Sequence, residues 1–256
     1  MIKELCACTL VCRSWHTRAK LRLYQDVHLG SGRVSKFQTL VRKNPNLPLA
    51  STEAMSVRCN IRPISGLLTI DKFKNLKSLS IYDLDLAKEH LPVTKGHIFR
   101  TVKHLLLSAI HSCTVSNILR FINSFQSLTE LDLLCPVGKL FQHKGVLSPP
   151  RSAPVPCLRR LHLWVVPGVG ELLKWYIQEE HFLKSLEALR ISLDITYDEP
   201  SPGYHACIDG CTALLRHCAG TLNDLNFGGS LNKSPLVDEV ANTGKLLHIN
   251  KASHTD

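Results

Sequence analysis

The side chains best suited to chemistry in this chain are its ten cysteines and thirteen histidines, which in other proteins bind metals or act as nucleophiles and bases. Six of the cysteines lie in two clusters: Cys6, Cys8 and Cys12 near the start, and Cys207, Cys211 and Cys218, with His205 and His217, near the end. A structural zinc site usually needs two closely spaced pairs of ligands. Neither cluster has a matching second pair, so we expect no metal ligands and no metal cofactor.

Motifs for catalysis and cofactor binding do not occur in the sequence. There is no G-x-S-x-G, no phosphate-binding loop, no G-x-G-x-x-G and no H-E-x-x-H. No histidine pairs with a serine or cysteine in a recognisable catalytic frame. We therefore expect no catalytic residues, no cofactor and no enzymatic activity in this chain.

A short apolar frame, L-x-x-L-x-L with Val, Ile or Phe as replacements, recurs along the chain and predicts its fold. The copies are Leu76/Leu79/Ile81, Val102/Leu105/Leu107, Leu128/Leu131/Leu133, Leu158/Leu161/Leu163, Leu186/Leu189/Ile191 and Leu222/Leu225/Phe227, with weaker ones at Val27/Leu29, Met55/Val57 and Leu247/Ile249. The first members of the six full copies lie 26 to 36 residues apart, and most of these spacings fit leucine-rich repeats. The last two apolar positions point to the same side of a strand, so each copy predicts a strand with one buried face.

The segments between the frames carry apolar residues at helical spacing, over 34–41, 115–125, 169–177 and 207–218. Alternating strands and helices predict an α/β fold, an irregular leucine-rich-repeat solenoid with a curved parallel sheet and helices on its convex side. We expect this solenoid to occupy residues 27–256, after a short helical segment at 1–26. Two proline-containing stretches, 143–157 and 197–204, are predicted to be surface loops.

The third and fifth positions of the frame, and the residue after it, are expected to line the concave side of the solenoid. There they carry two positive and three negative formal charges, whereas a nucleic-acid groove is strongly positive. Tyr, Trp and Arg dominate the binding energy of protein interfaces, which favours a protein target, with a solvated face without a partner as the alternative. The candidate target-binding residues are Tyr82, His104, Glu130, Asp132, Arg160, His162, Trp164 and Arg190.

The net charge of +10 lies mostly at one end: residues 1–45 hold nine Lys and Arg against two acidic residues. This basic segment makes nucleic-acid binding a second alternative. The apolar runs are far shorter than the roughly 20 residues that span a bilayer, and the N-terminus lacks the pattern of a signal peptide. We therefore expect no membrane partner, reduced cysteines and a cytoplasmic or nuclear location.

The segment 8–29, CTLVCRSWHTRAKLRLYQDVHL, resembles the second half of an F-box of the fungal type. Members of that family carry a C-x-L-V-C-R-x-W run, then an Arg-rich helix and a V-x-L strand that lead into irregular leucine-rich repeats. The segments 118–133 and 214–227 also look like the repeats of that family. The resemblance covers most of the chain and implies that residues 1–26 are a partial, N-terminally truncated F-box.

The resemblance also implies a function. F-box proteins of this type are non-catalytic substrate-recognition subunits of SCF-type ubiquitin ligases, and they bind a Skp-type adaptor and through it a cullin. On this chain the adaptor-binding face would be formed by Leu10, Val11, Cys12 and Trp15. The same helical face would otherwise pack into the small core of the domain itself. A repeat scaffold for protein–protein interaction, uncoupled from the ligase, is the first alternative function.

Overall fold

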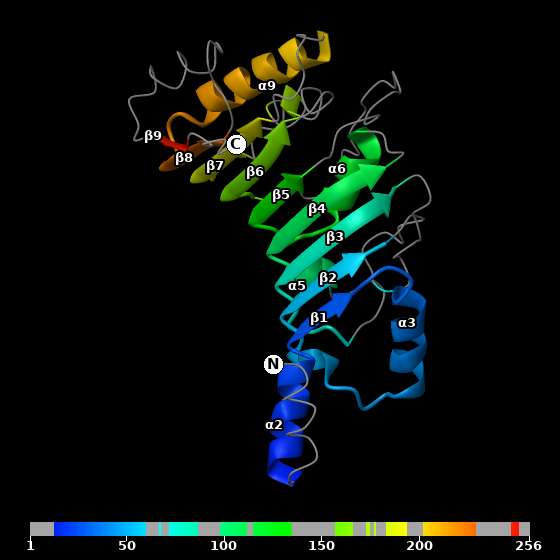
Figure 1. Cartoon of the computed structure of the whole chain (residues 1–256). Helices are drawn as coiled ribbons and strands as arrows, with labels where there is room; N and C mark the ends of the chain where they lie inside the picture. Colours follow the sequence, from blue (N-terminus) through cyan, green and yellow to red (C-terminus); the bar gives the residue numbers. More distant parts are fainter. Residues whose placement is uncertain are drawn as a thin grey trace, which may run out of the picture.

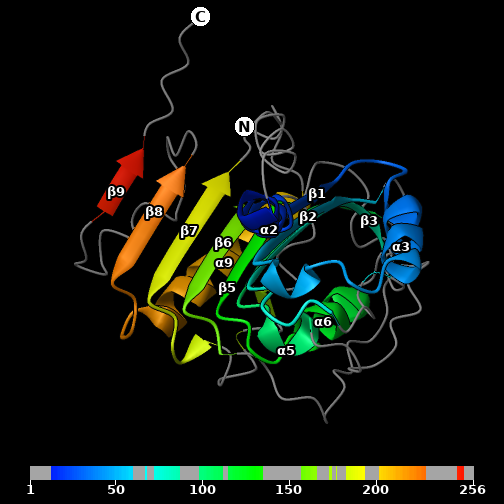
Figure 2. The same ribbon diagram turned by 90° about the horizontal axis from the view of Figure 1, so that it is seen from below.

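The fold is an α/β arrangement built on one open, parallel sheet whose strands follow the order of the chain (Figures 1 and 2). The computed structural model describes residues 13–59, 67, 72–86, 98–111, 115–134, 157–165, 173–174, 177, 183–193, 202–228 and 247–250. Within these residues the sheet has nine strands, with β1 at one edge and β9 at the other. Among the described helices none is both long enough and apolar enough to cross a membrane.

The strands are β1 (Asp26–Leu29), β2 (Ala54–Arg58), β3 (Ser78–Asp85), β4 (His104–His111), β5 (Glu130–Leu134), β6 (Arg160–Val165), β7 (Ala188–Leu193), β8 (Asp224–Gly228) and β9 (Leu247–Asn250). Each strand of the predicted frame is present, the three weaker copies included. The register aligns the frames: Leu79, Leu105, Leu131, Leu161, Leu189 and Leu225 are Cα partners from one strand to the next. Equivalent positions of successive repeats therefore lie side by side across the sheet.

The connecting helices are α2 (Arg13–Leu23), α3 (Val34–Lys43), α5 (Ile98–Thr101), α6 (Val115–Asn123) and α9 (Pro202–Cys218), with a 3₁₀ turn η1 (Leu49–Ser51). The predicted helices over 34–41, 115–125 and 207–218 are confirmed as α3, α6 and most of α9. Of the predicted helix 169–177 the structure describes only three residues, which are helical.

One continuous core joins the apolar face of the sheet to the helices α3, α6 and α9. Leu105, Leu131 and Leu133 are at most 1% exposed and share the core cluster with residues of α3, α6 and α9. Phe121 and Phe125 meet edge to face, with ring centroids 5.3 Å apart. Large aromatic and leucine side chains contribute most of the free energy of burial, so the packing of the helices on the sheet follows from the apolar spacing in the sequence.

The loop predicted at 197–204 is wrong in its last three residues, because α9 begins at Pro202. Proline fixes φ near the helical value, and the first residues of a helix need no N–H donor, so a proline is well tolerated there. Of the other predicted loop, 143–157, only Cys157 is described, and it lies outside helices and strands.

Two strands break their alternation at the same place. Asp83 in β3 and Ala109 in β4 have φ of 57° and 56°, and the residues on either side of them are register partners across the two strands. A left-handed residue within a strand shifts the side chains that follow, and Leu84 and Asp85 are accordingly both buried. Because a left-handed alanine costs roughly 1–2 kcal/mol relative to its right-handed form, this feature stores strain at Ala109.

The Ala109→Gly variant should be more stable than the parent by about 0.5–1 kcal/mol, since glycine accepts a positive φ without steric penalty. Glycine has more conformational freedom than alanine in the unfolded chain, which reduces this gain in stability. The matched control is Ala188→Gly at the start of β7, which should lose about 0.5–1 kcal/mol. Urea unfolding of both variants measures the two changes, and a loss of stability in the Ala109 variant would contradict the strain.

Candidate functional site

The polar side chains of the sheet gather on the face opposite the helices, which we call the open face. Along each strand, residues next to the buried leucines point to the opposite face of the sheet. The third and fifth positions of the frame therefore lie on the open face. The register sets them in rows: His104, Glu130 and Arg160 are successive partners in one row, and Asp132 and His162 are partners in the next. Side chains on adjacent strands are close enough to interact in such rows.

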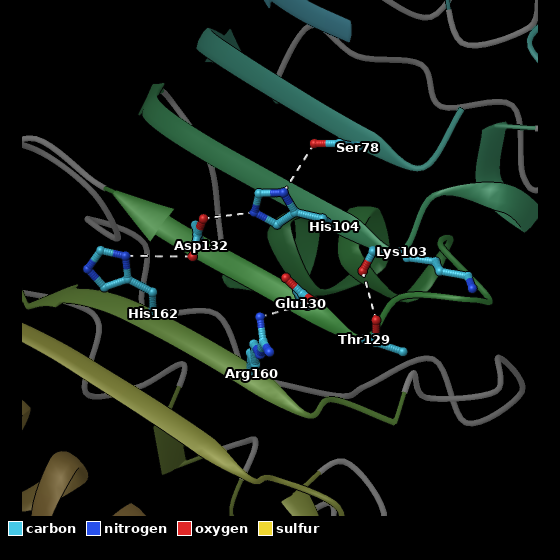
Figure 3. A network of polar contacts seen from close by, with 8 residues as sticks. All are labelled: Ser78, Lys103, His104, Thr129, Glu130, Asp132, Arg160 and His162. Atoms are coloured by element: carbon cyan, nitrogen blue, oxygen red, sulfur yellow. Dashed lines mark hydrogen bonds and ion pairs between the residues drawn. The ribbon is translucent and has the colours of Figure 1, made fainter. Parts of the chain in front are cut away.

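Five residues from five successive strands are linked into a chain across the open face by hydrogen bonds and one ion pair, and Figure 3 shows four of them, from Ser78 to His162. The members of the chain are Ser78 on β3, His104 on β4, Asp132 on β5, His162 on β6 and Ser192 on β7. His104 Nε2 donates to Asp132 Oδ2 at 2.8 Å, and its Nδ1 lies 3.1 Å from Ser78 Oγ. We name this chain the His–Asp–His chain.

The second histidine completes the chain on the other side of the carboxylate. His162 Nδ1 lies 3.6 Å from Asp132 Oδ1, at ion-pair distance, and His162 Nε2 lies 3.2 Å from Ser192 Oγ. The exposed fractions of the two histidines and the aspartate are 21–32%, so these side chains are half-buried. Hydrogen bonds to a charged group in such surroundings are stronger than those in open water.

The environment of Asp132 favours its ionised form. Burial alone would raise the pKa of this carboxyl, but the hydrogen bonds and charges of His104 and His162 outweigh it and hold the pKa well below its usual range. The carboxylate is therefore ionised at neutral pH.

His104 responds in the opposite sense. Its hydrogen bond to Asp132 raises its pKa, burial opposes the rise, and the negative charges of Asp132 and Glu130 add to it. When the ring is neutral with Nε2 protonated, Ser78 donates to Nδ1; when the ring is charged, Nδ1 donates to the hydroxyl oxygen. The serine hydroxyl thus accommodates both protonation states without a change of backbone.

Ion pairs and aromatic rings flank the chain. Arg160 Nη1 lies 3.7 Å from Glu130 Oε1, as Figure 3 shows, and Arg58 Nε lies 3.3 Å from Asp83 Oδ2. The guanidinium of Arg58 also lies 5.9 Å from the centre of the Tyr82 ring, within the range of a cation–π contact.

Two further candidates, Trp164 and Arg190, extend the face over β6 and β7. Trp164 is 38% exposed although it is among the largest apolar side chains. Arg190 is exposed, is the register partner of His162, and makes no ion pair within the part of the chain that the structure describes. Tryptophan and arginine are among the residue types that most often dominate the binding energy of protein interfaces.

The structure therefore brings together five of the eight residues predicted to bind a target. His104, Asp132 and His162 lie in the chain, with Glu130 and Arg160 beside it, whereas Tyr82 contacts Arg58 instead. Ser78, Ser192 and Arg58 were missed as site residues. The frame placed the two serines on this face, but their uncharged hydroxyls gave no sign that they terminate the chain.

The residues predicted to face the adaptor are mostly beyond the described part. Leu10, Val11 and Cys12 lie outside the described residues. Trp15 lies in the first turn of α2 and is 56% exposed. It therefore does not pack into the core that the structure describes.

The buried cysteines of α9 behave as apolar core residues. Cys211 is fully buried and Cys218 is 1% exposed, and burial raises the pKa of the Cys218 thiol to about 12. A thiol that stays protonated is a poor ligand and a poor nucleophile. Within the described residues no group of three or more His, Cys, Asp or Glu is arranged to hold a metal ion.

No protein-family model matches this chain, and no curated protein matches it. The arrangement on the open face is therefore interpreted by its chemistry. It offers hydrogen-bond donors and acceptors, the three arginines Arg58, Arg160 and Arg190, and an exposed indole on a broad sheet surface, which suits recognition of another macromolecule.

Proposed function

We propose that this protein is a non-catalytic substrate-recognition subunit, similar to the F-box receptors of SCF-type ubiquitin ligases. In this proposal the open face binds the target protein, and α2 with the residues before it binds a Skp-type adaptor. The chemistry of ubiquitin transfer belongs to other subunits. The parallel sheet is then the inner layer of an irregular leucine-rich-repeat solenoid.

The observation that carries the proposal is the combination of order and exposure on the open face. The His–Asp–His chain fixes the rotamers of five side chains, so little side-chain entropy is lost when a partner covers them. Trp164 and Arg190 stand at the end of this ordered surface and remain exposed. A rigid polar surface beside exposed anchor residues is what protein recognition requires.

Regular backbone hydrogen bonds support the solenoid interpretation. The residue before each of the strands β2 to β8 donates to the carbonyl of the equivalent residue one repeat earlier, for example Lys77 to Glu53 at 2.8 Å, Lys103 to Lys77 at 2.8 Å and Thr129 to Lys103 at 2.9 Å. Each repeat therefore contacts its neighbours in the same way, as in a stacked-repeat protein.

The exposure of Trp15 supports the adaptor side of the proposal. A tryptophan that is more than half exposed on a helix leaves a large apolar surface in water. A docked protein would remove that surface at a favourable free energy of roughly 25 cal/mol per Å².

The test of the adaptor side is co-purification of the chain with a Skp-type adaptor, followed by size-exclusion chromatography. We expect a stoichiometric complex, and we expect Trp15→Ala to weaken it by more than 2 kcal/mol, the loss typical of a tryptophan anchor. The matched control is Leu40→Ala, because Leu40 is an exposed apolar residue on a different helix. Equal binding by the parent and both variants would contradict the docking face.

The target side is tested separately by quantitative mass spectrometry of proteins retained by the parent and by a Trp164→Ala, Arg190→Ala variant. A partner lost from this variant but retained by Leu40→Ala supports recognition by the open face. Loss of the adaptor complex with retention of such a partner would instead favour a repeat scaffold uncoupled from the ligase.

A further inference from the structure

A separate hollow lies where α2 meets the loops that precede β2 and β3. Its volume is about 490 Å³, and it is open to solvent, because the residues that line it are exposed or half-buried. Arg18, Leu21 and Arg22 of α2 form one wall, and Gln25, Ser51 and Asn75 belong to the other. None of these residues takes part in the open face.

The α2 wall is cationic. Arg18 and Arg22 are four residues apart on one helix, so their side chains lie on the same face about one turn apart. Arg22 Nη1 donates to Gln25 Oε1 at 2.9 Å, which holds this guanidinium at the rim. Arg18 makes no ion pair among the described residues, so within that part of the chain its guanidinium is available to a ligand.

The carboxylate among the described residues that line the hollow already has a cationic partner. Glu53 lines it, and Glu53 Oε2 lies 3.7 Å from Lys77 Nζ. The two arginines together with this pair therefore carry a local charge near +2. A phosphate monoester carries about −1.5 to −2 at neutral pH and matches this charge, whereas a single carboxylate leaves one guanidinium unpaired.

The facing wall supplies acceptors. Ser51 Oγ donates to the Pro48 carbonyl at 2.6 Å, and Asn75 Nδ2 uses one of its two N–H groups to donate to the Ala50 carbonyl at 2.8 Å. Asn75 Oδ1 and the Glu53 carboxylate remain as acceptors. Ligand hydroxyl groups are the natural donors to such atoms.

We propose that this hollow binds the phosphate monoester of a small polyhydroxy compound. The phosphate lies between Arg18 and Arg22, where guanidinium groups bind its oxygens in bidentate fashion. The hydroxyl groups of the ligand donate to Asn75 and Glu53, and Leu21 supports its apolar edge. This inference does not depend on the proposed function of the open face.

The test uses glucose 6-phosphate as the probe, with glucose and inorganic phosphate as comparisons. Trp15 is one turn before Arg18 on α2, so its fluorescence reports on the hollow, and Trp15→Phe identifies its part of the signal. We expect saturable binding of glucose 6-phosphate that is lost with rising salt, weaker binding of inorganic phosphate, and none of glucose.

Removing either arginine gives the decisive comparison. Arg18→Gln and Arg22→Gln should each weaken glucose 6-phosphate binding at least about tenfold, the loss of a charge-assisted hydrogen bond. The control Arg42→Gln changes an arginine in the last turn of α3 and should have no effect. Equal losses in all three variants, or no saturable binding by the parent, would overturn the proposal. Equal affinity for inorganic phosphate would overturn the role of the facing wall.

Discussion

Leu133→Ala should destabilise the protein by about 2–5 kcal/mol, one of the two largest effects that we expect for a single substitution. Leu133 is 1% exposed on β5 and belongs to the core between the sheet and the helices. Truncation removes buried apolar surface and leaves a cavity, and both effects lower the free energy of unfolding. Urea unfolding monitored by circular dichroism measures this loss.

The neighbouring residue provides the matched control. Leu134 follows Leu133 on the same strand but lies half-buried on the open face. Leu134→Ala should therefore cost about 1 kcal/mol or less, because less apolar surface is lost and no closed cavity forms. Similar losses in the two variants would show that β5 does not present its faces as described, since a shift of one residue exchanges them.

This pair of leucines also shows why the sheet could be predicted from the sequence. The frame requires only that apolar residues two positions apart face the same way. Repetition of the frame then forces neighbouring strands into one register, because any other pairing would expose the leucines. The strands and the polar positions followed from this logic, and three helices followed from the helical spacing of apolar residues between the frames.

Other features depend on contacts that no local pattern encodes. The left-handed residues Asp83 and Ala109 follow the frame, where the alternation carries no constraint on the next residue. Pro202 was interpreted as part of a loop because proline often ends regular structure, although it is also suited to begin a helix. In both cases the sequence allows two conformations, and packing against the rest of the chain selects one.

The candidate site was predictable as a surface but not as a network. The sequence placed His104, Asp132 and His162 on the open face, yet it treated them as separate contacts. Whether a histidine reaches a carboxylate diagonally or directly across depends on rotamers and on strand twist. The chain that ends at Ser78 and Ser192 became apparent only from the distances.

The protonation of this chain gives the open face a defined pH response. The pKa of His104 is raised above its ordinary value of 6.5, so its contribution to stability is complete below that pH and is lost as the pH rises through the raised value. The pKa of Asp132 is lowered from 3.8, so its contribution is present above 3.8 and is lost as the pH falls through the lowered value. Both contributions are complete only between pH 3.8 and pH 6.5.

Asp132→Asn should therefore destabilise the protein most in mildly acidic solution. Near pH 5.5 it removes a carboxylate that accepts from a charged His104, and we expect a loss of about 1.5–3 kcal/mol. At a higher pH, above the raised pKa of His104, the ring is neutral in the parent as well, so the loss should fall to about 1 kcal/mol. Urea unfolding of parent and variant at both pH values measures the difference.

Asp209→Asn is the matched control, since Asp209 is exposed on α9 and makes no ion pair among the described residues. A loss for Asp132→Asn that is independent of pH would show that the carboxylate only fills space, whereas the expected decline ties the order of the open face to the charge of His104.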